Sequence, residues 1–321
     1  MIYISIPVHE KIEIIIDQAK NFYKFFPEAM IVLHLSKGAA FSLDNLKSEL
    51  SKENVNNVLV NPKQVETSWG GILNAHLENI RYILTLGDAE DAEKVIFHSS
   101  NDMLVKKGVF DYVKNRKNIF NQRPISEDSF WWVGRRALKD LPMMNFFNNH
   151  LLGSQIEGSM YEISLLEELI KEVDKNPNLL KSNRPYPKEE IIFSSFANKK
   201  NIENNGLPYI FSEVHRFDHT FFKYINKYLA LFDRNGITYK TLKYIINLLV
   251  LRLLKYQINI RDINAIVDSN AEYFKGYTEL IDGKNIKWSV FDINNIFGVK
   301  RVSRDMQNTI RISINNINGD L

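Results

Sequence analysis

The first hundred residues of the chain alternate short apolar runs with longer stretches of helical periodicity. Residues 1–8 (MIYISIPV), Ala29–Ser36, Asn54–Val60 and Lys94–His98 are apolar and rich in β-branched residues, which is typical of buried strands. Within residues 12–26, apolar side chains recur every three or four positions, so they share one face of a helix. Strands separated by helices predict an α/β fold, in which a parallel sheet has helices on both faces.

Polar residues follow three of these expected strands. His9 follows the first strand, Ser36 ends the second, and Ser99–Asp102 follows the strand at 94–98. In a parallel sheet these carboxyl ends share one edge, which is where such sheets bind ligands. We therefore expect His9, Ser36, Ser100 and Asp102 at a nucleotide-binding edge. A histidine that bonds only to backbone is an equal alternative for His9.

Asp102 is open to three interpretations. Its carboxylate can accept hydrogen bonds from a sugar hydroxyl, can bind a metal ion together with Asn101, or can cap its own turn. Sugar-nucleotide enzymes often end a central strand in two acidic residues that hold a metal on the diphosphate. This strand end carries one acidic residue, so a metal is the least favoured of the three.

Composition narrows the class of protein. The 321 residues carry a net charge of +3, which is too small to indicate nucleic-acid binding, and no nucleic-acid partner is expected. Cysteine is absent, which excludes disulfides and suits a reducing compartment. The amino terminus lacks the basic region of a signal peptide, and the apolar run Ile245–Leu254 is too short to span a bilayer. We expect a cytoplasmic protein, with the inner face of the membrane as an alternative location.

The remainder of the chain divides into an irregular middle and a helical end. Pro187 precedes an expected helix that has Glu189 and Glu190 in its first turn. Residues 218–270 have a strongly helical pattern, and the tail reads as short strands around a basic loop. We expect a core at 1–210, and a largely helical region at 211–321 packed on it.

Four segments, taken in order, resemble one enzyme family. They are VHEKIEIIIDQ, ETSWGGILNAHLENIRYIL, VIFHSSNDMLVKKGVFDYV and GSQIEGSMYEISLLEELI followed by YPKEEIIFSSF. Their order and spacing resemble the core-2 and I-branching β-1,6-N-acetylglucosaminyltransferases and the peptide xylosyltransferases, which form glycosyltransferase family 14. The resemblance covers roughly Met1–Phe196, and it implies a GT-A-like fold with a Rossmann-type core sheet.

Individual motifs match with two departures. The matching positions are the strand into His9-Glu10, Ser68-Trp69-Gly70, Phe97–Leu104, Gly153-Ser154-Gln155 and Glu189-Glu190. Ile156 replaces a family tryptophan. Family members also have an acidic residue that contacts the nucleoside at the end of the second strand, where this chain has Ser36 beside Lys37. The base of the nucleotide, uridine or another, therefore stays open.

The resemblance also implies a mechanism. Family members invert the anomeric centre and work without a metal, so no cofactor is expected and a lone Asp102 fits. It implies that Glu190 is the general base, whereas acids in a first helical turn are also explained by the helix dipole. The donor would be a nucleotide diphosphate sugar such as UDP-GlcNAc or UDP-xylose. The leaving diphosphate would be stabilised by the basic loop that holds Lys300, Arg301 and Arg304.

The acceptor would be a glycan or a glycolipid, as in the synthesis of a bacterial capsule or O-antigen. Glu189 and the adjacent Trp131 and Trp132 are candidates for acceptor binding, although the tryptophans could equally cover the sheet. Two rival functions are a metal-dependent GT-A transferase that uses Asp102, and a non-catalytic nucleotide- or glycan-binding protein. Peripheral membrane association and a homodimer both stay open. The apolar helix at 244–256 suits the contact of a partner subunit or a homodimer, although such helices are more often core.

Overall fold

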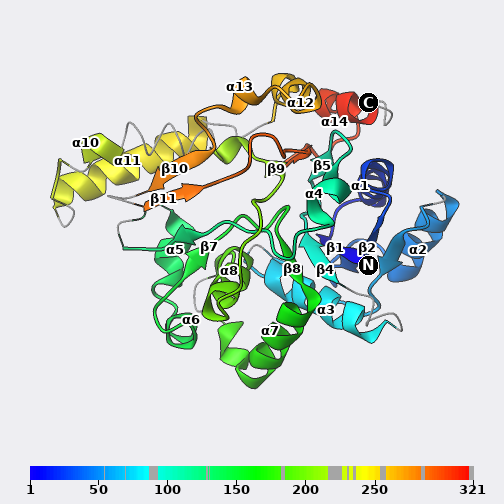
Figure 1. Cartoon of the computed structure of the whole chain (residues 1–321), viewed down its shortest axis with the longest axis horizontal. Helices are drawn as coiled ribbons and strands as arrows, with labels where there is room; N and C mark the ends of the chain where they lie inside the picture. Colours follow the sequence, from blue (N-terminus) through cyan, green and yellow to red (C-terminus); the bar gives the residue numbers. More distant parts are fainter. Residues whose placement is uncertain are drawn as a thin grey trace.

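A computed structural model (Figure 1) describes residues 1–53, 55–68, 70–86, 93–127, 129, 131–181, 185–215, 226–229, 231–233, 236–253, 258–282 and 286–317. Its centre is a five-stranded sheet in the order β3-β2-β1-β4-β8. The strands are β1 (Ile2–Val8), β2 (Ala29–Leu35), β3 (Val58–Val60), β4 (Lys94–Phe97) and β8 (Met160–Glu162). The first four are parallel, and β8 is antiparallel to β4. The expected α/β class is therefore confirmed.

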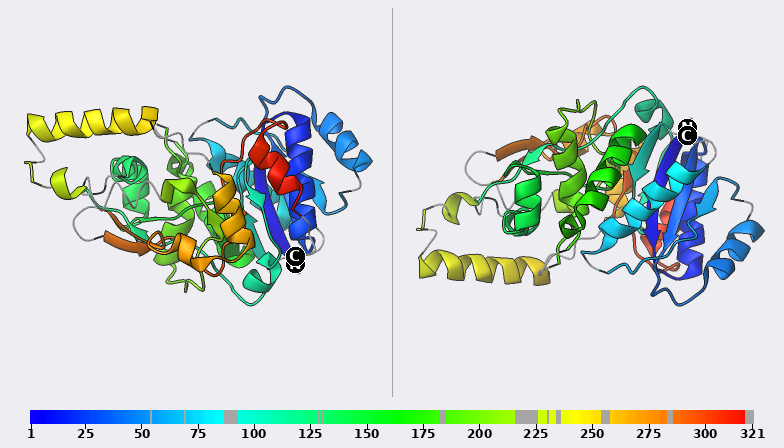
Figure 2. Two further views of the ribbon diagram at one scale, coloured as in Figure 1. Left: turned by 90° about the horizontal axis from the view of Figure 1, so that it is seen from above. Right: turned by 90° about the horizontal axis from the view of Figure 1, so that it is seen from below.

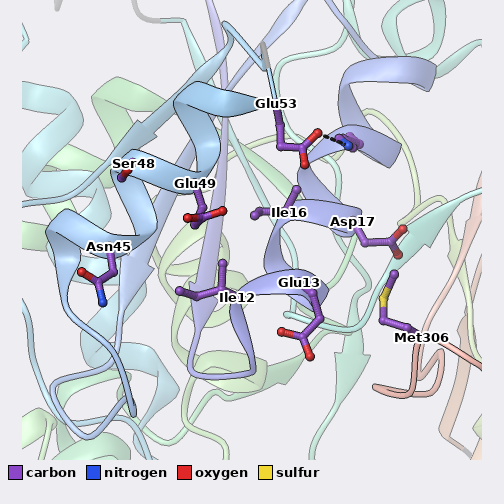
Figure 3. Close-up of a pocket in the computed structure, with 10 residues that line it drawn as sticks. Ile12, Glu13, Ile16, Asp17, Asn45, Ser48, Glu49, Glu53 and Met306 are labelled. Carbon is purple, nitrogen blue, oxygen red and sulfur yellow. Dashed lines mark ion pairs between the residues drawn. The ribbon is translucent and has the colours of Figure 1, made fainter.

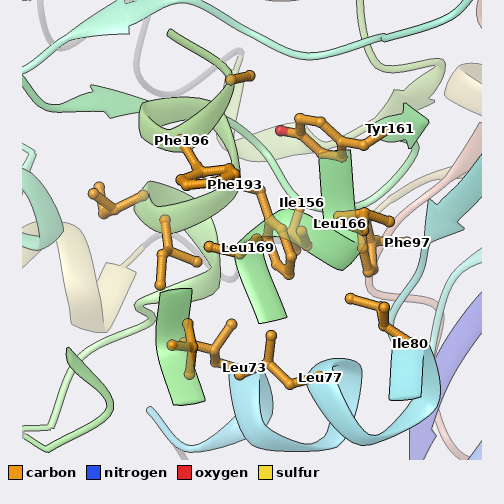
Figure 4. Close-up of a cluster of buried hydrophobic side chains, with 14 of the residues drawn as sticks. Leu73, Leu77, Ile80, Phe97, Ile156, Tyr161, Leu166, Leu169, Phe193 and Phe196 are labelled. Carbon is orange, nitrogen blue, oxygen red and sulfur yellow. The ribbon is translucent and has the colours of Figure 1, made fainter. Parts of the chain in front are cut away.

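Helices cover both faces of this sheet, as expected (Figures 1 and 2). One face packs on α1 (Ile12–Phe25) and α2 (Leu43–Lys52), and the other packs on α3 (Ile72–Thr85), α7 (Ile163–Lys175) and α8 (Glu189–Lys199). Alternate side chains of each strand supply the two cores. In Figure 4, Phe97 of β4 lies between Ile80 of α3 and Phe193 of α8, and the two phenylalanine rings stack at 4.5 Å. This stacking ties the start of α8 to the carboxyl end of β4.

Local sequence patterns predict most of these elements, but the start of one helix differs from the prediction. The strand at 54–60 is shorter than expected. The sequence also predicts a helix capped by Ser68 or Thr67, but α3 begins at Ile72. The reason is a turn in which Ser68 O accepts from Gly71 N, so Gly71 is the N-cap. Trp69 lies outside the described residues. The helix that the sequence predicts near 107–113 is observed as α4 (Val109–Val113), two residues shorter at its start.

The elements between the sheet and the carboxyl-terminal region are short. They are β5 (Met103–Leu104), β6 (Arg123–Pro124), α5 (Trp132–Ala137), α6 (Leu141–Phe146), β7 (Leu152–Gly153) and the 3₁₀ turn η2 (Pro177–Leu179). β6 pairs with β7, and β7 lies beside α8. Leu152 N donates to Ser195 Oγ of α8, so this hairpin is held to the helix by a side-chain bond.

The carboxyl-terminal region is largely helical, as expected, and it shares a sheet with the core. Its elements are β9 (Ile210–Phe211), α10 (Asn226–Leu229), α11 (Ile237–Leu253), α12 (Ile260–Val267), α13 (Ala271–Phe274), β10 (Glu279–Asp282), β11 (Ile286–Ser289), β12 (Gly298–Val299) and α14 (Thr309–Asn315). β12 lies between β5 and β9 in a second sheet, so the division expected near residue 210 falls within a strand.

One helix in the tail was predicted to be a strand. The sequence RISI was interpreted as strand, but it lies in α14, which begins at the N-cap Asn308. The pattern misleads because Arg311 is fully buried, where it binds Asp17 of α1 and donates from Nε to Ser303 O at 2.8 Å. Among the described residues, no helix is long and apolar enough to cross a membrane.

Candidate active site

The first group of polar side chains lies at the carboxyl ends of β1 and β4. Glu10 is buried, and its carboxylate accepts from the Ser100 hydroxyl and pairs with Arg304 Nε at 2.7 Å. His9 is half-exposed beside it, with Nε2 at 3.4 Å from Glu10 Oε1. Arg304 Nη2 also donates to Ser100 Oγ at 3.3 Å. We call His9, Glu10, Ser100 and Arg304 the strand-end cluster. It brings together three residues that the sequence indicated separately.

Ser36 lies at the end of β2 but faces inward. Its side chain is buried, and Ser36 Oγ accepts from Thr67 N at 3.2 Å. Its carbonyl accepts from Ala39 N at 3.0 Å, while Lys37 beside it is exposed. The serine therefore anchors the 64–68 segment against the sheet edge, and the neighbouring lysine is the side chain that solvent reaches.

Asp102 is the centre of a closed network. Its side chain is fully buried, with one oxygen accepting from Ser99 Oγ at 2.7 Å and the other from Ser99 N at 2.9 Å. His98 Nδ1 lies 3.1 Å from the carboxylate, and His98 Nε2 lies 2.7 Å from Tyr209 OH. Gln18 holds the same turn by donating to Asp102 O. This geometry corresponds to the turn-capping interpretation, because burial leaves the carboxylate no face toward a ligand.

A basic loop, Lys300–Arg304, joins this edge of the sheet to a second group. β12 leads into it, and Val302 N donates to Asn101 O at 3.0 Å, which fastens the loop to the turn after β4. Arg301 has a φ of 66°, a left-handed conformation that a non-glycine residue adopts at a cost. One end of the loop delivers Arg304 to the strand-end cluster, and the other delivers Lys300 to a group of acids.

That second group is the acid cluster, which we define as Glu157, Glu189, Glu190 and Lys300. Lys300 Nζ pairs with Glu157 Oε2 at 2.7 Å, and both side chains are largely buried. Glu189 and Glu190 are in the first turn of α8, as the sequence predicts. Glu189 is buried, and its Oε2 has no hydrogen-bond partner among the described residues, whereas Glu190 is only partly buried. The two adjacent glutamates thus differ in access to solvent.

Burial changes the acidity of both glutamates. It raises the pKa of Glu190 to about 7, with Lys300 opposing the shift and Glu157 adding to it. It raises the pKa of Glu189 to about 8, with the neighbouring Glu190 carboxylate adding to the shift. Near neutral pH, Glu189 is therefore mostly protonated, while Glu190 is divided between its acid and base forms. A carboxyl group in that state can take up a proton.

Three further side chains border the acid cluster. Arg301 and Arg123 both act on Glu190 by lowering its pKa, although burial prevails. His215 is buried, and its pKa falls to about 3 because of burial and the positive charges of Lys300, Arg301 and Arg123. This histidine is neutral at physiological pH. Its Nδ1 has no hydrogen-bond partner among the described residues, and the other members of the HRFDH motif, Asp218 and His219, lie outside them.

The paired tryptophans separate into two roles. The ring of Trp131 stacks on the Arg123 guanidinium at 4.4 Å and lies against Gly153, where an added Cβ would approach it to 2.5 Å. Trp132 is exposed on α5. Trp131 therefore packs over an arginine that acts on Glu190, and Trp132 presents its ring to solvent.

Sequence reasoning missed Glu10, Glu157 and Arg123. The signal for Glu10 was its place beside His9 at a strand end, and Glu157 stands two residues after the Gly-Ser-Gln motif. Gln155 itself is structural, since its Nε2 donates to Glu157 O at 2.8 Å and to Ile210 O at 2.9 Å. Arg123 had no sequence signal, because the partner that holds it, Asp282, lies 159 residues away.

A groove of about 700 Å³ lies between α1 and α2, and no residue of either cluster lines it (Figure 3). It is lined by Ile12, Glu13, Ile16, Asp17, Lys20, Asn45, Ser48, Glu49, Glu53 and Met306, and none of these was indicated by the sequence as a site residue. The Lys20–Glu53 ion pair spans it. Within the part of the chain that is described, no three His, Cys, Asp or Glu residues are grouped so as to hold a metal ion.

Comparison with known proteins gives limited results. No protein-family model matches the chain, and no curated protein is similar to it in sequence. Solved structures that resemble the chain include two that cover more than half of it. The chain matches the crystal structure of S. aureus TarS with 17% identity and a TM-score of 0.35, over 61% of this chain and 33% of TarS. It thus spans about a third of the length of that structure.

The second structure is the mannosyltransferase PcManGT from Pyrobaculum calidifontis, solved in complex with GDP-Man and Mn²⁺. It matches with 10% identity and a TM-score of 0.36, over 86% of this chain and 81% of PcManGT. At these scores the likeness concerns the arrangement of elements, and it matches no residue of either structure to a residue of this chain.

Proposed function

We propose that this protein is an inverting glycosyltransferase in which Glu190 is the general base. The observation that carries the proposal is the state of this carboxyl group: mostly buried but still accessible to solvent, with a pKa raised to about 7, and beside fixed cations. A base of this acidity accepts a proton at neutral pH without being permanently charged or permanently protonated. The family resemblance of the sequence assigns the same role to this position.

The two clusters support separate roles for the two ends of the basic loop. The basic loop puts Arg304 at the strand-end cluster and Lys300 at the acid cluster, each held by a carboxylate. A nucleotide diphosphate at the sheet edge would meet the loop where negative charge develops as the sugar leaves. Fixed cations there stabilise that charge without rearrangement. We propose that Lys300, Arg301 and Arg304 replace a metal ion in this task.

The chemical step follows from these positions. Glu190 takes the proton of an acceptor hydroxyl, whose oxygen forms a bond to the anomeric carbon of the donor sugar from the face opposite the leaving diphosphate. The bond between the anomeric carbon and the diphosphate oxygen breaks, and its electron pair stays with the diphosphate. Glu189, protonated near neutral pH, adds no second negative charge beside the base. The acceptor is a glycan or glycolipid, and the donor sugar is of the GlcNAc or xylose type.

The donor site is tested by measuring the melting temperature with UDP, UDP-GlcNAc, UDP-xylose or GDP-mannose, each in EDTA and in Mn²⁺. A ligand that binds only the folded state raises the melting temperature. We expect a uridine nucleotide to raise it as much in EDTA as in Mn²⁺. Stabilisation that requires Mn²⁺ would overturn the metal-independent mechanism. Binding without sugar transfer to any glycan acceptor would favour a non-catalytic nucleotide-binding protein.

A further inference from the structure

Exposed apolar side chains gather on α10, on α11 and on the described residues between them, which together we call the arm. Six of the large hydrophobic residues exposed in the described chain lie within residues 228–245, although α10 and α11 are a small part of the whole. Ile237 is 83% exposed, Leu231 79%, Tyr228 68% and Tyr244 65%. Figures 1 and 2 show α10 and α11 at the end of the molecule farthest from the parallel sheet. These residues therefore project from the body and do not complete its core.

The exposed side chains of α11 form one face. Ile237, Thr241, Tyr244 and Ile245 are spaced as neighbours on one side of a helix, and all are exposed together with Lys240. The helix begins near α5, where Arg135 interacts electrostatically with Tyr239. Trp132 of α5 is also exposed. An apolar and aromatic surface thus extends from α11 toward α5.

The charge of the arm decides between occupants. The sequences of α10 and α11 contain four Lys and Arg residues and no acidic residue, a charge of +4, whereas the whole chain carries +3. The rest of the chain is therefore net negative by one charge. A second copy would bring two pairs of helices of charge +4 together, which is unfavourable. A sheet of anionic lipid headgroups is complementary to both the positive charge and the exposed Tyr, Ile and Leu side chains.

We propose that α10 (Asn226–Leu229) and α11 (Ile237–Leu253) form an interfacial arm that binds an anionic membrane surface. The apolar face of α11 enters the boundary between headgroups and acyl chains, and the lysines contact the headgroups. Such an arm lies on the membrane and does not cross it. It would hold the protein at a surface from which a glycolipid can reach the site, although its binding is independent of any transferase activity.

The test is sedimentation of the full chain with vesicles of phosphatidylcholine alone or with one third phosphatidylglycerol. We expect binding to the anionic vesicles only, and release at high salt, because screening weakens surface electrostatics. Lys240→Glu should weaken binding about tenfold, since each lysine near such a surface contributes and the reversal adds repulsion. The double variant Ile237→Glu/Tyr244→Glu should abolish it. Lys47→Glu on α2 and Ile312→Glu on α14 are exposed matched controls that should bind like the wild type.

Two results would overturn the proposal. One is equal binding by the arm variants and the controls, or no binding to either vesicle. The other is a wild-type protein that binds no vesicles and is a dimer in light scattering, if Ile237→Glu/Tyr244→Glu converts that dimer to a monomer. That result would assign the apolar face of α11 to a second copy of the chain. Circular dichroism and the melting temperature of each variant show whether a loss of binding reflects unfolding. Because nucleotide binding is measured separately, failure here leaves the proposed transferase function untouched.

Discussion

Asp102 and Glu190 are the two acids that the sequence indicated most strongly, and they occupy opposite environments. Asp102 is fully buried, and both of its oxygens accept hydrogen bonds from its own turn. Glu190 is partly buried beside Lys300, with its pKa raised to about 7. A buried carboxylate with all its partners in place stabilises a structure, because it has no unused capacity. A carboxyl group that solvent still reaches and whose pKa is raised is available for proton transfer.

The largest expected effect is on catalysis at Glu190. Glu190→Gln keeps the size of the side chain and removes its basicity, so sugar transfer should fall about 10³-fold. For the wild type, kcat/KM should rise with pH through about 7, since the deprotonated carboxylate is the active form. Nucleotide binding and melting temperature should change little. Glu168→Gln, an exposed acid on α7, is the control and should be fully active. Normal turnover by Glu190→Gln would show that Glu190 is not the general base, and the contrast with Asp102 would then be wrong.

The second effect is on stability at Asp102. Asp102→Ala removes the acceptor of the Ser99 amide and the partner of His98 Nδ1 in a buried site, and it takes one acceptor from the Ser99 hydroxyl, which should lower the free energy of unfolding by about 3 kcal/mol. Urea unfolding measures this loss. The kcat of the molecules that stay folded should fall far less than in Glu190→Gln. A stable Asp102→Ala protein with no activity would show that this acid, too, has a chemical role.

The smallest effect is a pH-dependent stability at Glu189. Its folded pKa of about 8 lies above the ordinary value of 4.5, so the folded state holds the proton more tightly. The contribution of Glu189 to the free energy of unfolding is therefore full below pH 4.5, and it is lost as the pH rises through 8. Glu189→Gln resembles the protonated acid. It should match the wild type in urea at pH 4.5 and exceed it by at least about 1 kcal/mol at pH 9. Equal stability at both values would contradict the raised pKa.

Much of the fold was predictable because its signals are local. Alternating apolar strands and helical stripes placed β1, β2, β4, α1 and α8 close to their observed bounds. The same reading put Glu189 and Glu190 in a first helical turn. It failed for α14, because a charged residue, Arg311, occupies a buried position of this helix, where it pairs with Asp17. It also failed at the start of α3, where a turn that ends at Gly71 delays the helix.

The sequence by itself determined which residues follow each strand, and hence that His9 and Ser100 share one edge of a parallel sheet. Only the tertiary structure decided which of these side chains face outward. Ser100 meets Arg304 from 204 residues away, and Asp102 is enclosed with the help of Tyr209. The pKa of Glu190 likewise depends on Lys300 and Glu157, which other elements deliver. Burial and charge are properties of these assembled neighbours, so no local pattern could reveal them.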